Sequence, residues 1–184
     1  MAEKSFFSAK DIPQELNQGF EVTAFYDPKF GSFAAGAHIV AVNVNPKTGN
    51  VEIVRYVATE DVGTVINPAV VEGQIIGGIA QGIGEALLEE LVYDEAGQPR
   101  TVTLADYLIP SALEIPRIEL HHANTPSAAL GGFKGCGEGS IIGALGAVAC
   151  AVADALSRSG GDIHDFPASP ERVLKGLGVL RNEA

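Results

Sequence analysis

The stretch AHIVAVNVNPKTGNVEIVRYVAT, residues 37–59, contains the most strongly patterned pair of segments in the chain. Residues 37–45 and 50–59 are both rich in β-branched and apolar side chains, which favour extended strands. Between them, Asn45-Pro46-Lys47-Thr48-Gly49-Asn50 supplies residue types whose backbone angles suit a tight turn. The sequence therefore predicts a β-hairpin over residues 37–59.

Further elements are predicted on both sides of this hairpin. Upstream, Val22, Ala24 and Tyr26 alternate with other positions, which predicts a strand that ends at Asp27-Pro28. Downstream, Asn67-Pro68 has the residue types of an N-cap and a first helical position, and the apolar pattern predicts a helix to about Leu91. Beyond these, we expect a strand over 117–123, a loop over 124–137, a helix over 139–158, and a short helix from Ser169 to about Leu177.

The order of these elements favours the α+β class. We expect a mostly antiparallel sheet, with two long helices and a short C-terminal helix packed on it. Residues 20–180 are predicted to form this domain, and residues 1–19 a polar N-terminal arm.

Composition excludes several classes of function. With 23 acidic and 12 basic residues, the net charge is −11, which disfavours nucleic acid as a partner.

Cys136 and Cys150 have apolar neighbours typical of reduced, buried thiols, and no nearby cysteine or histidine set would bind zinc or an iron–sulfur cluster. The N-terminus lacks an apolar signal region, and the longest apolar stretch, 141–153, is too short to span a membrane. We therefore expect a cytoplasmic protein without a membrane span.

The predicted helix over 68–91 contains an unusual number of glycines. Each glycine inside a helix costs roughly 0.5–1 kcal/mol relative to alanine. Close approach of another backbone, or of a ligand, would justify them. Gln74 and Gln81 on the same helix could contact a polar ring edge, or could be exposed on a helix that packs through its glycines. The residues alone favour the second interpretation. The glycines are Gly73, Gly77, Gly78, Gly82 and Gly84.

The segment Lys134-Gly135-Cys136-Gly137-Glu138-Gly139-Ser140 is the strongest candidate for chemistry. Its glycines would let a bulky ligand approach the backbone, and the N–H groups at a helix start can hold an anion. An ordinary interpretation is equally open, because a glutamate near a helix start is favoured by the helix dipole. The four histidines are expected to be satisfied or at the surface, and we expect no metal site among them.

The ordered set of short motifs resembles one known family over roughly residues 20–180. The family comprises the molybdopterin-binding subunits of xanthine dehydrogenase, aldehyde oxidase and carbon monoxide dehydrogenase, and the resemblance is to the C-terminal part of that subunit. The motifs are Gly36-Ala37-His38, Asp61-Val62-Gly63, Asn67-Pro68, Glu72-Gly73-Gln74, Gln81-Gly82-Ile83-Gly84, Asp106-Tyr107 with Pro110, Thr125-Pro126-Ser127, and Lys134-Gly135-Cys136-Gly137-Glu138.

This resemblance implies a site and a reaction. Glu138 matches the glutamate that acts as the base when such enzymes hydroxylate an aldehyde or an N-heteroaromatic carbon, with water as the oxygen source. Gln74 would contact the pterin, and the backbone of Lys134, Gly135, Cys136 and Gly137 would line the other side of the cofactor. No residue of this chain is expected to bind the metal. Burial against the cofactor would favour the protonated form of Glu138, whereas the helix start would favour the anion.

The chain is much shorter than the subunits of that family. The resemblance therefore implies a molybdenum-containing molybdopterin, expected in its cytosine dinucleotide form, that is shared with a larger molybdopterin-binding subunit. Iron–sulfur clusters and FAD would lie on further subunits. We expect a naturally split subunit rather than an excised domain. Two alternatives are a non-catalytic assembly module that docks to the larger subunit, and a domain that binds a small anion.

Overall fold

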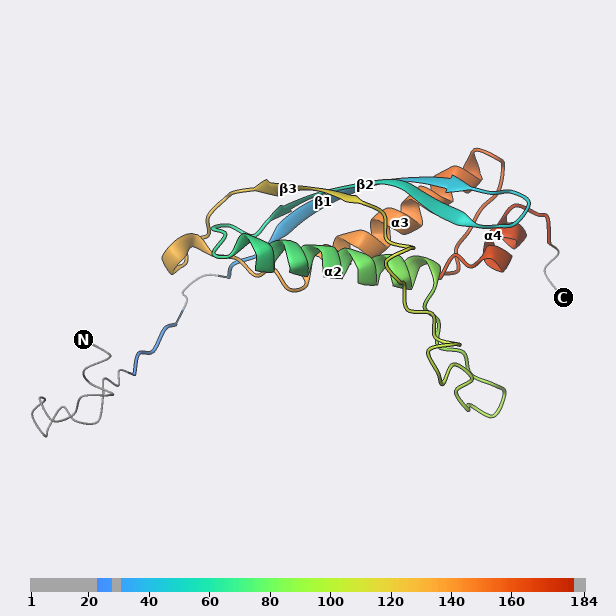
Figure 1. Ribbon diagram of the computed structural model, residues 1–184, viewed down its shortest axis with the longest axis horizontal. Coiled ribbons are helices and arrows are strands. Elements are labelled where there is room, and N and C mark those ends of the chain that lie inside the picture. Colours follow the sequence, from blue (N-terminus) through green and yellow to red (C-terminus); the bar gives the residue numbers. More distant parts are fainter. Residues whose placement is uncertain (1–22, 28–30, 181–184) are drawn as a thin grey trace, which may run out of the picture.

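The computed structural model describes residues 23–27 and 31–180 and shows a long hairpin with helices packed along one face (Figure 1). The predicted strand over residues 20–26 is wrong for residues 23–26, which form no strand, and residues 20–22 lie outside the described residues. The predicted arm, 1–19, also lies outside them. The elements are β1 (Ala35–Val44), β2 (Val51–Asp61), α2 (Pro68–Leu87), β3 (Ile118–Ala123), a 3₁₀ turn η3 (Leu130–Gly132), α3 (Gly139–Ser157) and α4 (Pro170–Gly176).

The hairpin of β1 and β2 has the predicted turn. The side-chain oxygen of Asn45 accepts a hydrogen bond from the backbone N–H of Lys47 at 2.9 Å, which closes the first half of the turn. Gly49 adopts φ +74°, a conformation that favours glycine. A Cβ atom there would lie 2.1 Å from the carbonyl oxygen of Pro170, so this glycine also lets the start of α4 approach the turn.

The sheet has the strand order β1-β2-β3 and is mixed. β1 and β2 pair antiparallel from Ala35 opposite Asp61 to Val44 opposite Val51. β3 pairs with the second half of β2 in parallel, because the chain crosses through α2 before it returns. Antiparallel pairing thus forms the longer ladder, and the α+β class is confirmed.

Helix α2 begins at the predicted cap and ends earlier than expected. Asn67 accepts a hydrogen bond from the N–H of Val70 and Pro68 is the first helical residue. The helix ends at Leu87 rather than near Leu91, because the N–H groups of Leu88 and Glu89 both donate to the carbonyl of Gly84 at 2.8 Å. Part of the following stretch, residues 88–117, forms the extension that projects away from the sheet in Figure 1, whereas Ile115 packs against the core.

Two of the α2 glycines are explained by its contact with α3. A Cβ atom on Gly78 would lie 3.1 Å from the Cβ atom of Ser140, and one on Gly82 would lie 2.5 Å from the Cβ atom of Ala144. Equal steps of four residues on both helices show that α2 and α3 run in the same direction. Gly73 and Gly77 have nothing within 4 Å of such an atom and so face open space. The interpretation of α2 as a glycine-packed helix is therefore confirmed for the face that meets α3.

The core lies between the sheet and these two helices. Its larger cluster is joined by a second one around α4. Helix α3 is long and apolar enough, by length and composition, to cross a membrane, but its inner face forms part of this core. Its outer face is exposed, and it carries Cys150, so the expected burial of that thiol is wrong. The buried apolar residues of the larger cluster are Tyr56, Ala58, Val62, Val71, Ile75, Ile79, Ile83, Ala86, Ala144 and Val148.

Candidate functional site

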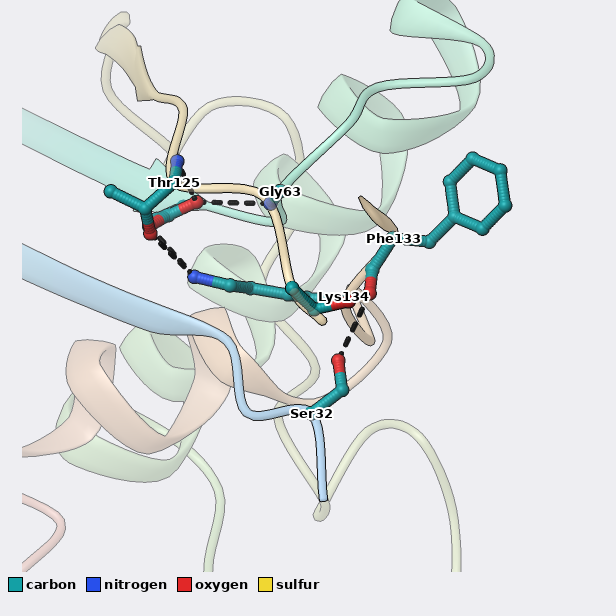
Figure 2. A network of polar contacts seen from close by, with 7 residues as sticks. Ser32, Gly63, Thr125, Phe133 and Lys134 are labelled. Carbon is teal, nitrogen blue, oxygen red and sulfur yellow. Dashed lines mark hydrogen bonds and ion pairs between the residues drawn. The ribbon is translucent and has the colours of Figure 1, made fainter. Parts of the chain in front are cut away.

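The carboxylate of Asp61, at the end of β2, fixes the loop that leads to α3 (Figure 2). It accepts hydrogen bonds from the N–H groups of Gly63, at 2.9 Å, and of Thr125, at 3.1 Å. The hydroxyl of Thr125 and the ammonium group of Lys134 donate to its second oxygen, the latter at 2.9 Å. The hydroxyl of Thr125 is the largest cause, and Lys134 the next, of a pKa for Asp61 well below its ordinary value.

Backbone pairing joins the same two segments. The N–H of Lys134 donates to the carbonyl of Val62 at 2.9 Å, and the N–H of Thr64 donates to the carbonyl of Gly132 at 3.0 Å. Gly63 lies between these bonds with φ +64°, and a Cβ atom there would be 2.3 Å from the carbonyl oxygen of Gly132. The start of the segment Lys134–Glu138 is therefore held by both side chains and backbone.

We expect Asp61→Asn to lower the melting temperature of the chain by several degrees at pH 7, because the amide group cannot satisfy the same donors. The folded-state pKa of Asp61 lies below its unfolded value, so its stabilisation is present above about pH 4 and is lost as the pH falls further. The difference in melting temperature between wild type and variant should therefore shrink below pH 4 in circular-dichroism melts. Asp154→Asn, in an exposed pair with Arg158, is the control. A difference that is equal at pH 3 and pH 7 would contradict this account.

Beyond Lys134, the chain alternates between anchored and open positions. A Cβ atom on Gly135 would meet nothing within 4 Å, whereas Cys136 is partly buried and packs against the core. A Cβ atom on Gly137 would meet only the side-chain nitrogen of Gln74, at 3.7 Å. The side chain of Gln74 thus extends from α2 across to this segment.

Glu138 is the N-cap residue of α3, and its side chain makes no capping hydrogen bond. The residue is exposed, as are Gln74, Gly135 and Gly137. Its carboxylate is therefore not committed to the helix that it precedes. This is the arrangement that a proton-accepting group requires, because a carboxylate bonded to its own helix would first have to be released.

The structure brings some of the predicted site residues together and separates one of them. The side chain of Gln74 lies against the backbone of Gly137, the residue that directly precedes Glu138, and the backbone of Gly135 is open. The ammonium group of Lys134 is instead turned to Asp61 and Thr125, and its backbone N–H is bonded to Val62. Lys134 therefore acts in this structure as an anchor for the loop.

Sequence reasoning missed a buried polar group on β1 and β2. The imidazole of His38 lies 2.8 Å from the hydroxyl of Tyr56 and 2.9 Å from a carboxylate oxygen of Glu60. The expectation that His38 is satisfied is confirmed. Its partners could not be found from sequence spacing, because the antiparallel register alone brings β1 and β2 together. The one available signal in the sequence was the carboxylate of Glu60, which lies two positions from apolar Ala58 and two from apolar Val62.

The exposed site residues fit one wall of a flat, polar cofactor. Gly73 and Gly77 leave the adjoining surface of α2 without side chains, so a ring system could lie against the backbone. The amide of Gln74 offers both donors and an acceptor to a ring edge. Within residues 23–27 and 31–180, no group of three or more histidine, cysteine, aspartate or glutamate side chains could hold a metal ion.

The comparisons with known proteins agree with this geometry. The molybdopterin cofactor-binding domain family matches residues 1–116. The nicotine 6-hydroxylase large subunit of Paenarthrobacter nicotinovorans is 40% identical over 95% of this chain and 22% of its own length. The carbon monoxide dehydrogenase large chain of Hydrogenophaga pseudoflava is 34% identical over 96% of this chain and 22% of its own.

A solved structure shares the fold. Quinoline 2-oxidoreductase from Pseudomonas putida 86 superposes with a TM-score of 0.84 and 43% identity, over 95% of this chain and 22% of that one. The chain thus spans about a fifth of the length of the relatives that it matches. With a family match over more than half of its residues, and a fold shared at 43% identity, the chain belongs to the molybdopterin-binding subunits of the xanthine dehydrogenase family of molybdenum-dependent oxidoreductases.

Proposed function

We propose that this chain forms one wall of the active site of a molybdenum hydroxylase and supplies its catalytic base, Glu138. The observation that carries the proposal is the exposed carboxylate of Glu138, which makes no capping bond and directly follows Gly137, the residue that the side chain of Gln74 approaches. A purely structural copy of the domain has no physical need for a carboxylate held in this way. The alternative, a non-catalytic assembly module, therefore explains the fold but not this side chain.

The bound cofactor would supply the two-electron acceptor and the water-derived oxygen nucleophile. Glu138 would accept the proton of that nucleophile as the new carbon–oxygen bond forms, and would later pass the proton to solvent. The amide of Gln74 would hold the edge of the pterin, while Gly135 and Gly137 would allow the cofactor to approach the backbone. The Asp61–Lys134 pair would keep this segment at a fixed height above α2.

The chain spans about a fifth of the length of its relatives, which supports a cofactor site that is shared with a larger molybdopterin-binding subunit. We propose that this cofactor is in the cytosine dinucleotide form. The "large subunit" and "large chain" in the names of two relatives support further subunits, on which we place iron–sulfur clusters and FAD. We propose an aldehyde or N-heteroaromatic substrate and a cytoplasmic location.

Exposed apolar side chains support docking to a larger subunit. The largest group lies in residues 88–117, where Leu104 is 74% and Leu113 is 93% exposed. The outer face of α3 adds Ile142, which is 71% exposed. Apolar area of this kind is unfavourable in water and is typical of a surface that another protein covers. An anion-binding domain that acts alone would have no use for it.

We expect no molybdenum on the chain when it is purified alone, and stoichiometric molybdenum and pterin in the complex recovered from the native host through a tag on this chain. Elemental analysis by mass spectrometry measures the metal, and fluorescence of the oxidised pterin measures the cofactor. Stoichiometric molybdenum on the chain alone would contradict a shared site. A stable complex that contains neither metal nor pterin would refute the proposed function.

A further inference from the structure

A carboxylate from the sheet lies directly beneath the start of α3. Glu60, on β2, is only 2% exposed, and its second carboxylate oxygen, Oε2, is 3.5 Å from the position that a Cβ atom on Gly139 would take. The same oxygen is 2.6 Å from the corresponding position on Gly36, its partner across the hairpin. A Cβ atom on residue 36 would therefore collide with the buried carboxylate, whereas the start of α3 lies in ordinary van der Waals contact with it. Gly139 follows Glu138 directly, so Glu60 lies close to the proposed base.

Two further buried groups hold this carboxylate. Nε2 of His38 lies 2.9 Å from Oε1 of Glu60, and Nδ1 of the same ring lies 2.8 Å from the hydroxyl of Tyr56. Burial first, and then the charge of Glu60, raise the pKa of Tyr56 far above its ordinary value, so its hydroxyl keeps its proton. That hydroxyl can donate to Nδ1, which leaves the proton of the imidazole on Nε2, where it donates to Glu60.

The first two turns of α3 rest on this group. A Cβ atom on Gly143 would lie 3.1 Å from both Cε1 and Nε2 of His38, one turn beyond the contact of Gly139 with Glu60. Gly139 and Gly143 thus lie on the face of α3 that contacts the Glu60–His38 pair. The close approach of His38 explains Gly143, a glycine that would otherwise weaken the helix near its start.

Negative charge would stabilise the start of α3, and the first turn of this helix contains none. The first N–H groups of a helix have no partners within it and carry the positive end of the helix dipole. The first turn of α3 contains no acidic residue, and the side chain of Glu138 makes no capping bond. The carboxylate of Glu60 is buried and contacts Gly139, the first residue of this helix.

We infer that Glu60, held by His38 and Tyr56, is a positioning residue for Glu138. Its charge stabilises the start of α3 from the protein interior, so the carboxylate of Glu138 is not needed as a helix cap and stays directed toward the cofactor side. The role in the helix stands on the contacts of this chain alone. The role in catalysis rests on the proposed function of Glu138.

The first test uses the full chain without partners. Glu60→Gln keeps the shape and the bond to His38 but removes the charge, so the first turn of α3 should open more often. We expect the amides of residues 143–145, whose helical bonds close that turn, to exchange with deuterium roughly 5–30 times faster, as measured by NMR. Amides in the middle of α2 should be unchanged, and so should all amides in Glu119→Gln, which removes an exposed partner of Arg55. Unchanged exchange at residues 143–145 in Glu60→Gln would overturn the inference.

A milder variant guards against a chain that fails to fold. Tyr56→Phe retains the aromatic ring and removes only the hydroxyl that orients His38, and it should also speed exchange at residues 143–145. In the wild-type chain, ¹⁵N spectra of the imidazole of His38 should show the proton on Nε2. A neutral ring with its proton on Nδ1 would overturn the proposed orientation.

The second test uses the assembled complex and separates this inference from the proposed function. In Glu60→Gln we expect kcat to fall about tenfold or more, with KM and molybdenum content unchanged, because Glu138 is misplaced while the binding surface is intact. If Glu138→Gln abolishes turnover and Glu60→Gln leaves kcat unaltered, the positioning role is wrong. If Glu138→Gln itself retains full turnover, the proposed function fails, and the exchange measurements still decide whether Glu60 supports the helix.

Discussion

Replacing Glu138 by Gln should lower kcat of the assembled enzyme by roughly 10²–10⁴-fold, the range that a positioned general base contributes. Glutamine has nearly the same size and keeps an oxygen at the same place, but it cannot accept a proton in the working pH range. Because Glu138 makes no capping hydrogen bond, its replacement should disturb α3 little. The molybdenum content of the complex and the melting temperature of the chain should therefore stay close to those of wild type.

Controls separate this loss from general damage to the complex. Glu119→Gln removes a carboxylate from β3, in an exposed pair with Arg55, and should leave kcat unchanged. Glu138→Asp retains the carboxylate on a shorter side chain and should recover part of the activity. Equal turnover of wild type and Glu138→Gln at full molybdenum occupancy would show that the chain is an assembly module.

The second large effect concerns stability, and it compares two glycines of α2. Gly82→Ala should destabilise the chain by about 1–3 kcal/mol, the usual cost of an overpacked core. The new Cβ atom would lie 2.5 Å from that of Ala144 and 2.9 Å from the backbone nitrogen of Leu145, so α3 would have to move. Gly77→Ala should instead stabilise by roughly 0.5–1 kcal/mol, because nothing lies within 4 Å of its Cβ position and alanine favours the helix.

Urea denaturation of the two variants of the full chain measures this contrast directly. Both substitutions add one methyl group to the same helix, so the two variants differ only in what surrounds the added group. The expected difference in unfolding free energy is about 1.5–4 kcal/mol. Two variants of equal stability would mean that α2 and α3 do not pack through Gly82.

Local sequence was sufficient where an element is specified by its own residues. The turn of Asn45 and Gly49, the cap and proline at the start of α2, and the cap of α4 at Ser169 were all predicted and are confirmed, because each depends on contacts within a few residues. The end of α2 was placed four residues too late, since the bonds that end it give no distinct sequence pattern. The proposed roles of Glu138 and Gln74 came from the resemblance to a family and stay predictions.

Contacts between distant segments were decided only by the tertiary structure. Asp61 meets Lys134 across 73 positions of sequence, and Glu60 meets His38 through the register of the hairpin. The sequence shows each of these side chains but not its partner, because the energy of a buried charge depends on what the fold places beside it. In the same way, the sequence by itself determined that α2 is rich in glycine, whereas only its packing shows that Gly82 meets α3 and Gly77 is left open.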